Sequence, residues 1–388
     1  MNPLNVVFDL PAEIASGLQT GGYERVGGVV RDSGTKQVVA WLREGGSGEA
    51  AKALSQPPLP KLPLGSAAQM VAPMLSAVNL GVSVVGFAVV ITQLNQITDQ
   101  IRQIEAKVDQ VIVKLDDQAL AKLKAGVNAC LNAVELGDPA MRQLQAGLAL
   151  ITLHEARQYF NQQALRSAPK AEANSAEYVS LAFTALVAEV QTYLQLDEGD
   201  KAARILRQGL DELRPGLMRL MDIVLWRKAV YLRPDFKDQV DLNFILWLTN
   251  GFKRMQQPPG EHVQEISASE LFDALRPHLG EVFKSYEDWH ASIPQVLVDT
   301  SGVEDIRLGP FNQGQDTGRR YKLVKQGLAK GLAKIAALVE SHDRLCGQVL
   351  QLEELNRLGI KPSELEAMRA LPEGQAAAVL LVPAGTIA

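Results

Sequence analysis

Histidine and cysteine are the residue types in this sequence best suited to metal binding, acid–base catalysis or nucleophilic attack, but their spacing supports none of these. The five histidines are scattered and form neither an HExxH motif nor another metal-ligand pattern. Cys130 and Cys346 lie far apart in helical patterns, so they indicate buried free thiols in a reducing compartment rather than a disulfide framework. No metal and no cofactor are therefore expected. The histidines are His154, His262, His278, His290 and His342.

Two short stretches place a histidine near an acidic residue, as an acid–base pair would require. His154-Glu155 falls on an amphipathic helical pattern, where a solvated or capping pair is the commoner arrangement. Asp288-Trp289-His290 fits a helix end, with the indole packed and the imidazole near the negative end of the helix dipole. The sequence also lacks a GxSxG elbow, a Walker loop and a GxGxxG turn. We therefore predict no catalytic residue and no enzyme; a site assembled from distant residues is the remaining enzymatic alternative.

The composition indicates that helices position these residues. Of 388 residues, 47% are hydrophobic, 21% are charged and only 5% are aromatic, which favours a helical core over a β-sandwich. The net charge of −5 argues against a general nucleic-acid binder, which would present a basic face. The first ten residues do not resemble a secretory signal. The expected location is the cytoplasm, with any membrane association conditional.

Residues 1–45 show strand signals that the rest of the chain lacks. Residues 23–31 and 37–43 alternate like two strands, and residues 32–36 supply turn chemistry between them. We expect a small β-hairpin module that packs on the helical body, because an isolated hairpin is barely stable. Residues 46–66 have the Pro- and Gly-rich composition of a linker, and their PxxP pattern is also a weak ligand signal for an aromatic groove.

A charge-free segment that continues into a heptad pattern is the clearest feature of the sequence, and residues 67–136 are assigned to it. No charged residue occurs from Leu62 to Thr98. From residue 87 onwards, apolar residues recur in steps of three and four over four repeats, which is typical of a coiled coil. This seam consists of Phe87, Val90, Leu94, Ile97, Ile101, Ile104, Val108, Val111 and Leu115.

Residues 137–292 have the pattern of successive amphipathic helices in a bundle. Asp138 followed by proline is an N-cap signal, and Ser267 with Glu270 is a capping box. Pro215 is expected to interrupt one of these helices.

The C-terminal part is expected to begin with a loop at residues 293–318. A long amphipathic helix at 319–358 follows and is ended by Gly359, and the tail at 359–388 contains one apolar strand. The predicted fold class is mainly α: a long-helix bundle with an apolar, coiled-coil helix and a small N-terminal β-hairpin module.

The charge-free segment has three interpretations. It can be a buried central helix, a permanent transmembrane span, or a segment that is hidden in one state and inserted in another. The transmembrane interpretation is possible because residues 70–92 exceed the roughly 20 residues that a bilayer-spanning helix needs. Its side chains divide into two stripes, which packed spans need and a single anchor does not, although a soluble bundle would use them equally well. The small helix-packing stripe is Ala72, Ser76, Asn79, Ser83 and Gly86, and the bulky membrane-inserting stripe is Val71, Leu75, Val78, Val82, Val85 and Val89.

In architecture, the segment from Leu62 to about Leu115, with the helix at 319–358 as a partner, resembles the α-helical pore-forming toxins of the cytolysin A and haemolysin BL type. The resemblance covers under a third of the chain. It implies a bundle that holds an apolar segment against its body until the segment inserts and oligomerises. The N-terminal hairpin module and the lack of a secretion signal depart from that family, and they suggest an intracellular target membrane, as for a defence effector.

The sequence therefore predicts a membrane-active helical effector whose apolar segment inserts and oligomerises. Its partners would be membrane lipid, under conditions that expose the segment, and further copies of the chain; the N-terminal module offers a surface for a protein partner. The alternative is a soluble homo-oligomeric coiled-coil scaffold or adaptor with the apolar helix buried in its core. That alternative explains the heptads equally well and needs no membrane.

Overall fold

The described part of the chain in the computed structural model is mainly helical. The charge-free segment, the seam, the linker and the predicted C-terminal strand all lie outside the described residues. The described residues are 12–26, 29–32, 38–41, 117–234, 240, 242–258, 261, 263–298, 313–357, 359, 361 and 362.

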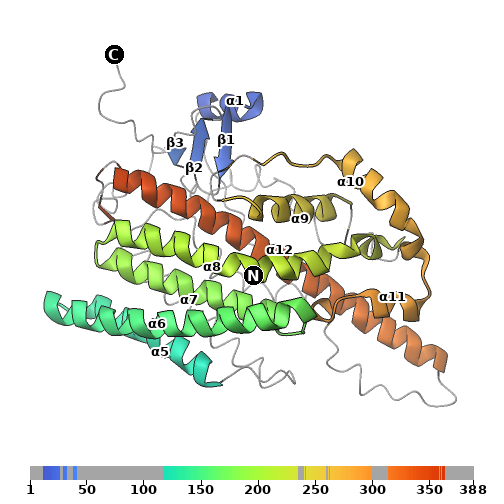
Figure 1. Cartoon of the computed structure of the whole chain (residues 1–388), viewed down its shortest axis with the longest axis horizontal. Coiled ribbons are helices and arrows are strands. Elements are labelled where there is room, and N and C mark those ends of the chain that lie inside the picture. The colour runs from blue at the N-terminus through green and yellow to red at the C-terminus, as the bar shows by residue number, and fades with distance from the viewer. Residues whose placement is uncertain are drawn as a thin grey trace, which may run out of the picture.

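Long helices that pack side by side form the body of the molecule (Figure 1). Along the chain, α5 packs against α6, α6 against α7, and α7 against α8, while α12 lies across α8 and also contacts α7. Short turns join α5 to α6 and α7 to α8, so these neighbours run antiparallel. Their bounds are α5 (Asp117–Glu135), α6 (Pro139–Ser167), α7 (Ser175–Gln195), α8 (Gly199–Trp226) and α12 (Gln313–Arg357).

Shorter helices cover one end of this body. Trp289 of α11 is fully buried there, and its Nε1 donates a hydrogen bond to the carbonyl of Val230 at 3.1 Å. The predicted packing of this indole is therefore confirmed. The shorter elements are η2 (Ala168–Lys170), η3 (Lys228–Leu232), α9 (Leu242–Met255), α10 (Ala268–Leu275), η5 (Arg276–Phe283), α11 (Tyr286–Ser292) and η6 (Gln295–Leu297).

Side-chain caps fix the starts of α6 and α10, as the sequence predicts. The Asp138 carboxylate accepts a hydrogen bond from the amide of Ala140 at 2.9 Å. At α10, the Ser267 hydroxyl accepts from the amide of Glu270, and the Glu270 carboxylate accepts from the amide of Ser267 at 2.6 Å. Each cap satisfies amides that would otherwise have no partner in the first helical turn.

Two predicted helix boundaries are wrong. Pro215 lies inside α8 instead of interrupting it, because Leu213 and Leu217 on either side are buried at 2% and 0% exposure and their packing outweighs the hydrogen bond that proline cannot make. The last helix begins at Gln313 and not at 319. Residues 313–318 contain Gly and Asp, which favour loops on their own, but adding residues to an existing helix costs little.

The end of α12 agrees with its prediction. Gly359 lies two residues after Arg357, the last helical residue, and has φ +70°, a conformation that glycine adopts without the penalty of a Cβ. The backbone amide of Gly359 donates to the carbonyl of Asn356 at 3.0 Å.

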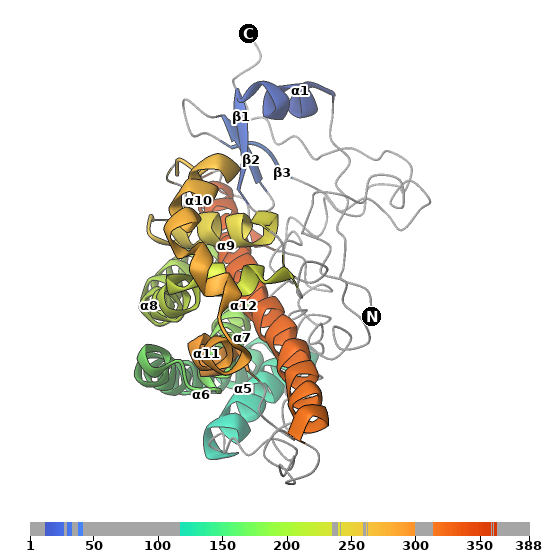
Figure 2. The same ribbon diagram turned by 90° about the vertical axis from the view of Figure 1, so that its right-hand side faces the viewer.

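The N-terminal elements are α1 (Ala12–Thr20) and three antiparallel strands in the order β1-β2-β3. Residues 23–31, predicted as one strand, form two: β1 (Tyr23–Val26) and β2 (Val29–Asp32), and β3 (Val38–Trp41) pairs with β2. Two consecutive glycines separate β1 from β2 in the sequence, and glycine weakens a strand interior. β1 and β2 contact α12, which places the sheet on one end of the body (Figure 2).

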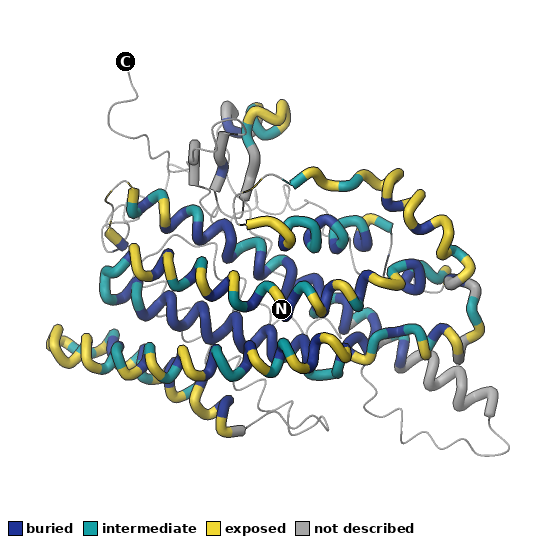
Figure 3. The backbone as a smooth tube through the Cα atoms, viewed as in Figure 1, coloured by how far each residue is buried: buried dark blue, intermediate teal, exposed yellow. Residues whose placement is uncertain are grey.

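The core lies along α7, which is buried over almost its whole length (Figure 3). Elsewhere, glycine allows backbones to approach closely. A Cβ at Gly331 of α12 would lie 2.5 Å from the carbonyl oxygen of Leu297 and 2.6 Å from its Cα, so the short turn of η6 rests directly on the helix backbone.

Candidate functional site

The residues on which the functional prediction depends are not among those that the structure describes. The membrane-inserting stripe, the small stripe and the seam all lie between residues 71 and 115, and the description of the body resumes at Asp117. The insertion and coiled-coil assignments therefore stay predictions. What the structure adds is the surface and the interior of the helical body that follows the seam.

The histidine pair suggested by the sequence does not form in the structure. Glu155 instead pairs with Lys122 of α5 at 2.8 Å, while His154 lies 3.4 Å from a Glu189 oxygen of α7. Its imidazole is about half exposed. Within the part of the chain that the structure describes, no cluster of His, Cys, Asp and Glu has the arrangement of a metal site.

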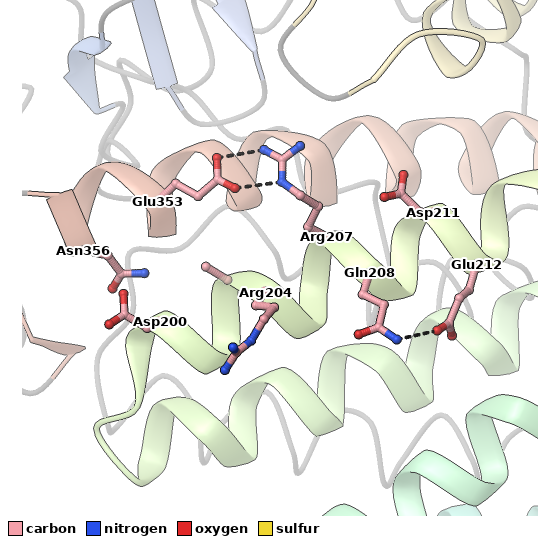
Figure 4. A pocket seen from close by; sticks show the side chains of 9 residues that line it. Asp200, Arg204, Arg207, Gln208, Asp211, Glu212, Glu353 and Asn356 are labelled. Atoms are coloured by element: carbon pink, nitrogen blue, oxygen red, sulfur yellow. Dashed lines mark hydrogen bonds and ion pairs between the residues drawn. The ribbon is translucent and has the colours of Figure 1, made fainter.

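A shallow groove between α8 and α12 collects polar side chains (Figure 4). Arg207 of α8 donates two hydrogen bonds to the Glu353 carboxylate of α12, with N···O distances of 2.7 and 2.8 Å. The hydrogen bond with this carboxylate raises the pKa of Arg207. The remaining lining residues are Asp200, Ala203, Arg204, Gln208, Asp211, Glu212 and Asn356.

The residues that line this groove can form ion pairs and hydrogen bonds, and they include carboxylates but no Ser, Thr, Cys or Lys. Asp200 and Asp211 are three helical turns apart on α8, about 16 Å at 1.5 Å per residue, so they cannot act together as a catalytic carboxylate pair. The bidentate Arg207–Glu353 pair joins α8 to α12. The geometry of the groove therefore supports helix packing.

A buried charge network ties α6 to α7 and α8. Arg157 of α6 is 1% exposed, and its Nε donates to the Glu189 carboxylate at 2.8 Å, while its Nη1 contacts Glu212 of α8. Burial acts to raise the pKa of Glu212, but Arg157 and Gln208 outweigh it and lower the pKa overall. His154 Nδ1 lies 3.1 Å from Arg157 Nη2 and 3.4 Å from a Glu189 carboxylate oxygen. These ion pairs and hydrogen bonds link α6, α7 and α8.

Both cysteines are buried and free, in agreement with the prediction from the sequence. Burial raises the pKa of the Cys130 thiol to about 11, although its hydrogen bonds with Thr192 and Gln195 act in the opposite direction. Because the thiolate is the reactive form, this thiol is inert near neutral pH. Cys346 lies 3.8 Å from both ring nitrogens of His342, on the same helix and inside the protein.

The feature that the sequence analysis missed is an apolar stripe on the outward face of α6. It consists of Met141, Leu144, Leu148 and Ile151, which are 51%, 60%, 53% and 62% exposed. The residues recur in steps of three, four and three, so they lie on one side of the helix. That spacing is the signal that could have identified this α6 stripe, since it is the spacing of the seam. Contiguous exposed apolar side chains of this kind mark surfaces that bind a partner.

No protein-family model matches the sequence, and no curated protein and no solved structure matches the chain. Among the described helices, none combines the length and the apolar character needed to cross a bilayer.

Proposed function

We propose that this chain is a membrane-active helical effector, pore-forming or membrane-perturbing, whose charge-free segment inserts into lipid and oligomerises. The observation that carries the proposal is the absence of charge from Leu62 to Thr98, directly followed by the seam. Residues 70–92 alone exceed the roughly 20 residues that a transmembrane helix needs. Within them, the small stripe would let transmembrane helices pack closely against one another, and the bulky stripe would face lipid.

The helical body supports this proposal in a secondary way. Side-chain packing and the Arg157 network fill its interior. Among the described residues, those of the groove and those around the cysteines hold helices together. In the proposed effector, the body carries the apolar segment in a water-soluble form in the cytoplasm. Membrane association is then conditional on release of that segment.

Dye release from liposomes tests the proposal on the full-length protein. An ionised side chain at the centre of a bilayer costs about 2.5–3.5 kcal/mol on insertion scales. Val82→Arg and Val85→Glu, both on the bulky stripe, should therefore abolish release while the protein still folds. Ser83→Ala, on the small stripe, is the matched control and should release dye like the wild type.

Thermal unfolding of the same variants separates insertion from a structural role. If Val82→Arg and Val85→Glu unfold the protein, the segment belongs to a dry core and the membrane proposal is wrong. A wild-type protein that releases no dye at neutral or acidic pH would overturn it as well.

The second candidate function is a soluble, homo-oligomeric coiled-coil scaffold or adaptor. The exposed α6 stripe favours it, because a scaffold needs apolar surface for its partners, and the N-terminal sheet on α12 offers a second surface. Under this function, Ile101→Asp should dissociate the oligomer in light scattering, and liposomes should stay intact with the wild type. An oligomer that Ile101→Asp leaves unchanged would contradict it.

A further inference from the structure

The α6 stripe is a second apolar face on a helix that already has one. The first face contains Ala146, Ala149 and Leu153, which are 0% exposed and pack towards α5 and α7. At 100° per residue, the stripe lies on nearly the opposite side of the helix, with each member more than half exposed. Exposing four neighbouring large apolar side chains to water is unfavourable, so we expect this second face to bind a second partner.

We infer that the second partner is the seam of the same chain, which packs on the α6 stripe in the resting protein. The stripe residues are spaced three, four and three, and so are Ile101, Ile104, Val108 and Val111 of the seam. Two apolar rows with the same spacing can interdigitate along parallel helices, as knobs fit into holes in a coiled coil.

The position at which α5 begins puts the seam within reach of this surface. Lys122, in the second turn of α5, lies 2.8 Å from Glu155 of α6, and Glu155 is one helical turn beyond Ile151. The chain therefore enters α5 at the C-terminal end of the α6 stripe. Only five residues, 112–116, lie between Val111 and the start of α5, and a chain spans at most about 3.6 Å per residue, so Val111 lies within about 22 Å of that start. In the proposed arrangement the chain turns back at this point, with Leu115 in the turn, so that Ile101 to Val111 run antiparallel to α5 and parallel to α6 beside the stripe.

The size of the stripe favours a tethered occupant over a second copy of the chain. Four side chains are far fewer than the 20–30 residues a side of a stable protein–protein interface. A segment joined to α5 by a short loop binds intramolecularly, at an effective concentration that compensates for a small contact. In the resting chain, the seam would then be covered by α6 and released before it pairs with other copies. This inference goes beyond the membrane proposal and does not depend on it, because docking requires no lipid.

Disulfide trapping tests the contact directly in the full-length protein. In a Cys130→Ala/Cys346→Ala background, Val108→Cys is combined with Leu144→Cys, Leu148→Cys or Ile151→Cys, which covers neighbouring registers. We expect an intramolecular disulfide in at least one of the three, seen as a faster band on a non-reducing gel. Val108→Cys with Arg219→Cys, an exposed position on α8, is the control that should not cross-link.

The other outcomes overturn the inference. A disulfide-linked dimer would assign the α6 stripe to a second copy, and no cross-link in any of the three pairs would show that the seam lies elsewhere.

Limited trypsin digestion gives an independent readout without new cysteines. Leu148→Asp introduces a charge into the proposed contact, so cleavage at Arg102, Lys107 and Lys114 should become about ten-fold faster or more, because proteolysis follows the population of the open form. Gln143→Asp, an exposed position on α6 outside the stripe, is the matched control and should cleave like the wild type. Equal cleavage of both variants would contradict the docked seam.

Discussion

α6 and α8 are neighbours in one bundle and nearly equal in length, at 29 and 28 residues, but they distribute apolar side chains in opposite ways. On α8, the large apolar residues such as Leu210 and Leu217 face the core and are 0% exposed. On the first half of α6, Leu144 and Leu148 face outwards, and on its second half Arg157 is buried.

This difference shows how a helix sequence indicates its partners. A helix with one apolar side, such as α8, has one contact surface, and its pattern shows which side that is. A helix such as α6, with apolar residues on two sides and a charge in the core, has almost no net amphipathicity. It therefore has two contact surfaces, of which α5 and α7 occupy one.

The largest effect is expected where α6 carries charge into the core. Arg157→Met leaves the 4%-exposed Glu189 carboxylate without its cation, and losing one partner of a buried ion pair costs about 3–5 kcal/mol of unfolding free energy. Urea denaturation measures this loss. The double variant Arg157→Met/Glu189→Leu should regain part of it, because the buried Glu189 carboxylate is gone, while Glu212 loses its cation but keeps its hydrogen bonds from Gln158 and Gln208. A loss below about 1 kcal/mol for Arg157→Met would mean that the inner side of α6 is not dry.

A matched pair of truncations compares the two helices directly. Leu217→Ala on α8 should lower the unfolding free energy by about 2–5 kcal/mol, since it leaves a cavity in the core. Leu148→Ala on α6 should cost less, about 1 kcal/mol, because its side chain lies outside that core and is covered only by the small contact proposed with the seam. The same denaturation experiment measures both. Equal losses would remove the contrast between the two helices.

The smallest effect concerns the helix starts. Asp138→Ala removes the cap of α6 and should lower the unfolding free energy by about 1 kcal/mol. Glu198, at the start of α8, makes no side-chain capping bond, so Glu198→Ala should change the unfolding free energy by only about a few tenths of a kcal/mol. Thermal melts of the two variants show the difference. A larger loss for Glu198→Ala would indicate that α8 depends on its first turn more than α6 does.

Local signals in the sequence were sufficient for the helical class and for several helix ends. The cap at Asp138, the capping box at Ser267 and the stop at Gly359 depend on side chains and backbone conformations within a few residues of each other. Pro215 could not be read in this way, because the packing that keeps α8 continuous comes from other helices.

The functional features depended even more on contacts between distant parts of the chain. Arg157 meets carboxylates 32 and 55 residues away, and a single sequence contains no sign of such a pairing. The α6 stripe does have a readable spacing, but the same spacing is usual for a core face, and only the structure shows that it faces outwards. The seam and the two stripes of the charge-free segment lie outside the described residues, so their assignment stays a prediction.

The contact at Gly331 has a consequence for how this fold can vary among descendants of the same ancestor. Even a methyl group at position 331 would collide with the Leu297 backbone, and a backbone cannot rotate away as a flexible side chain can. A lineage that lost this glycine would have to move η6 away from α12. We therefore expect this glycine, in the long C-terminal helix, to be kept together with the short turn about 34 residues before it while most of the surrounding sequence changes. The combination is a feature by which distant homologues of this chain can be recognised.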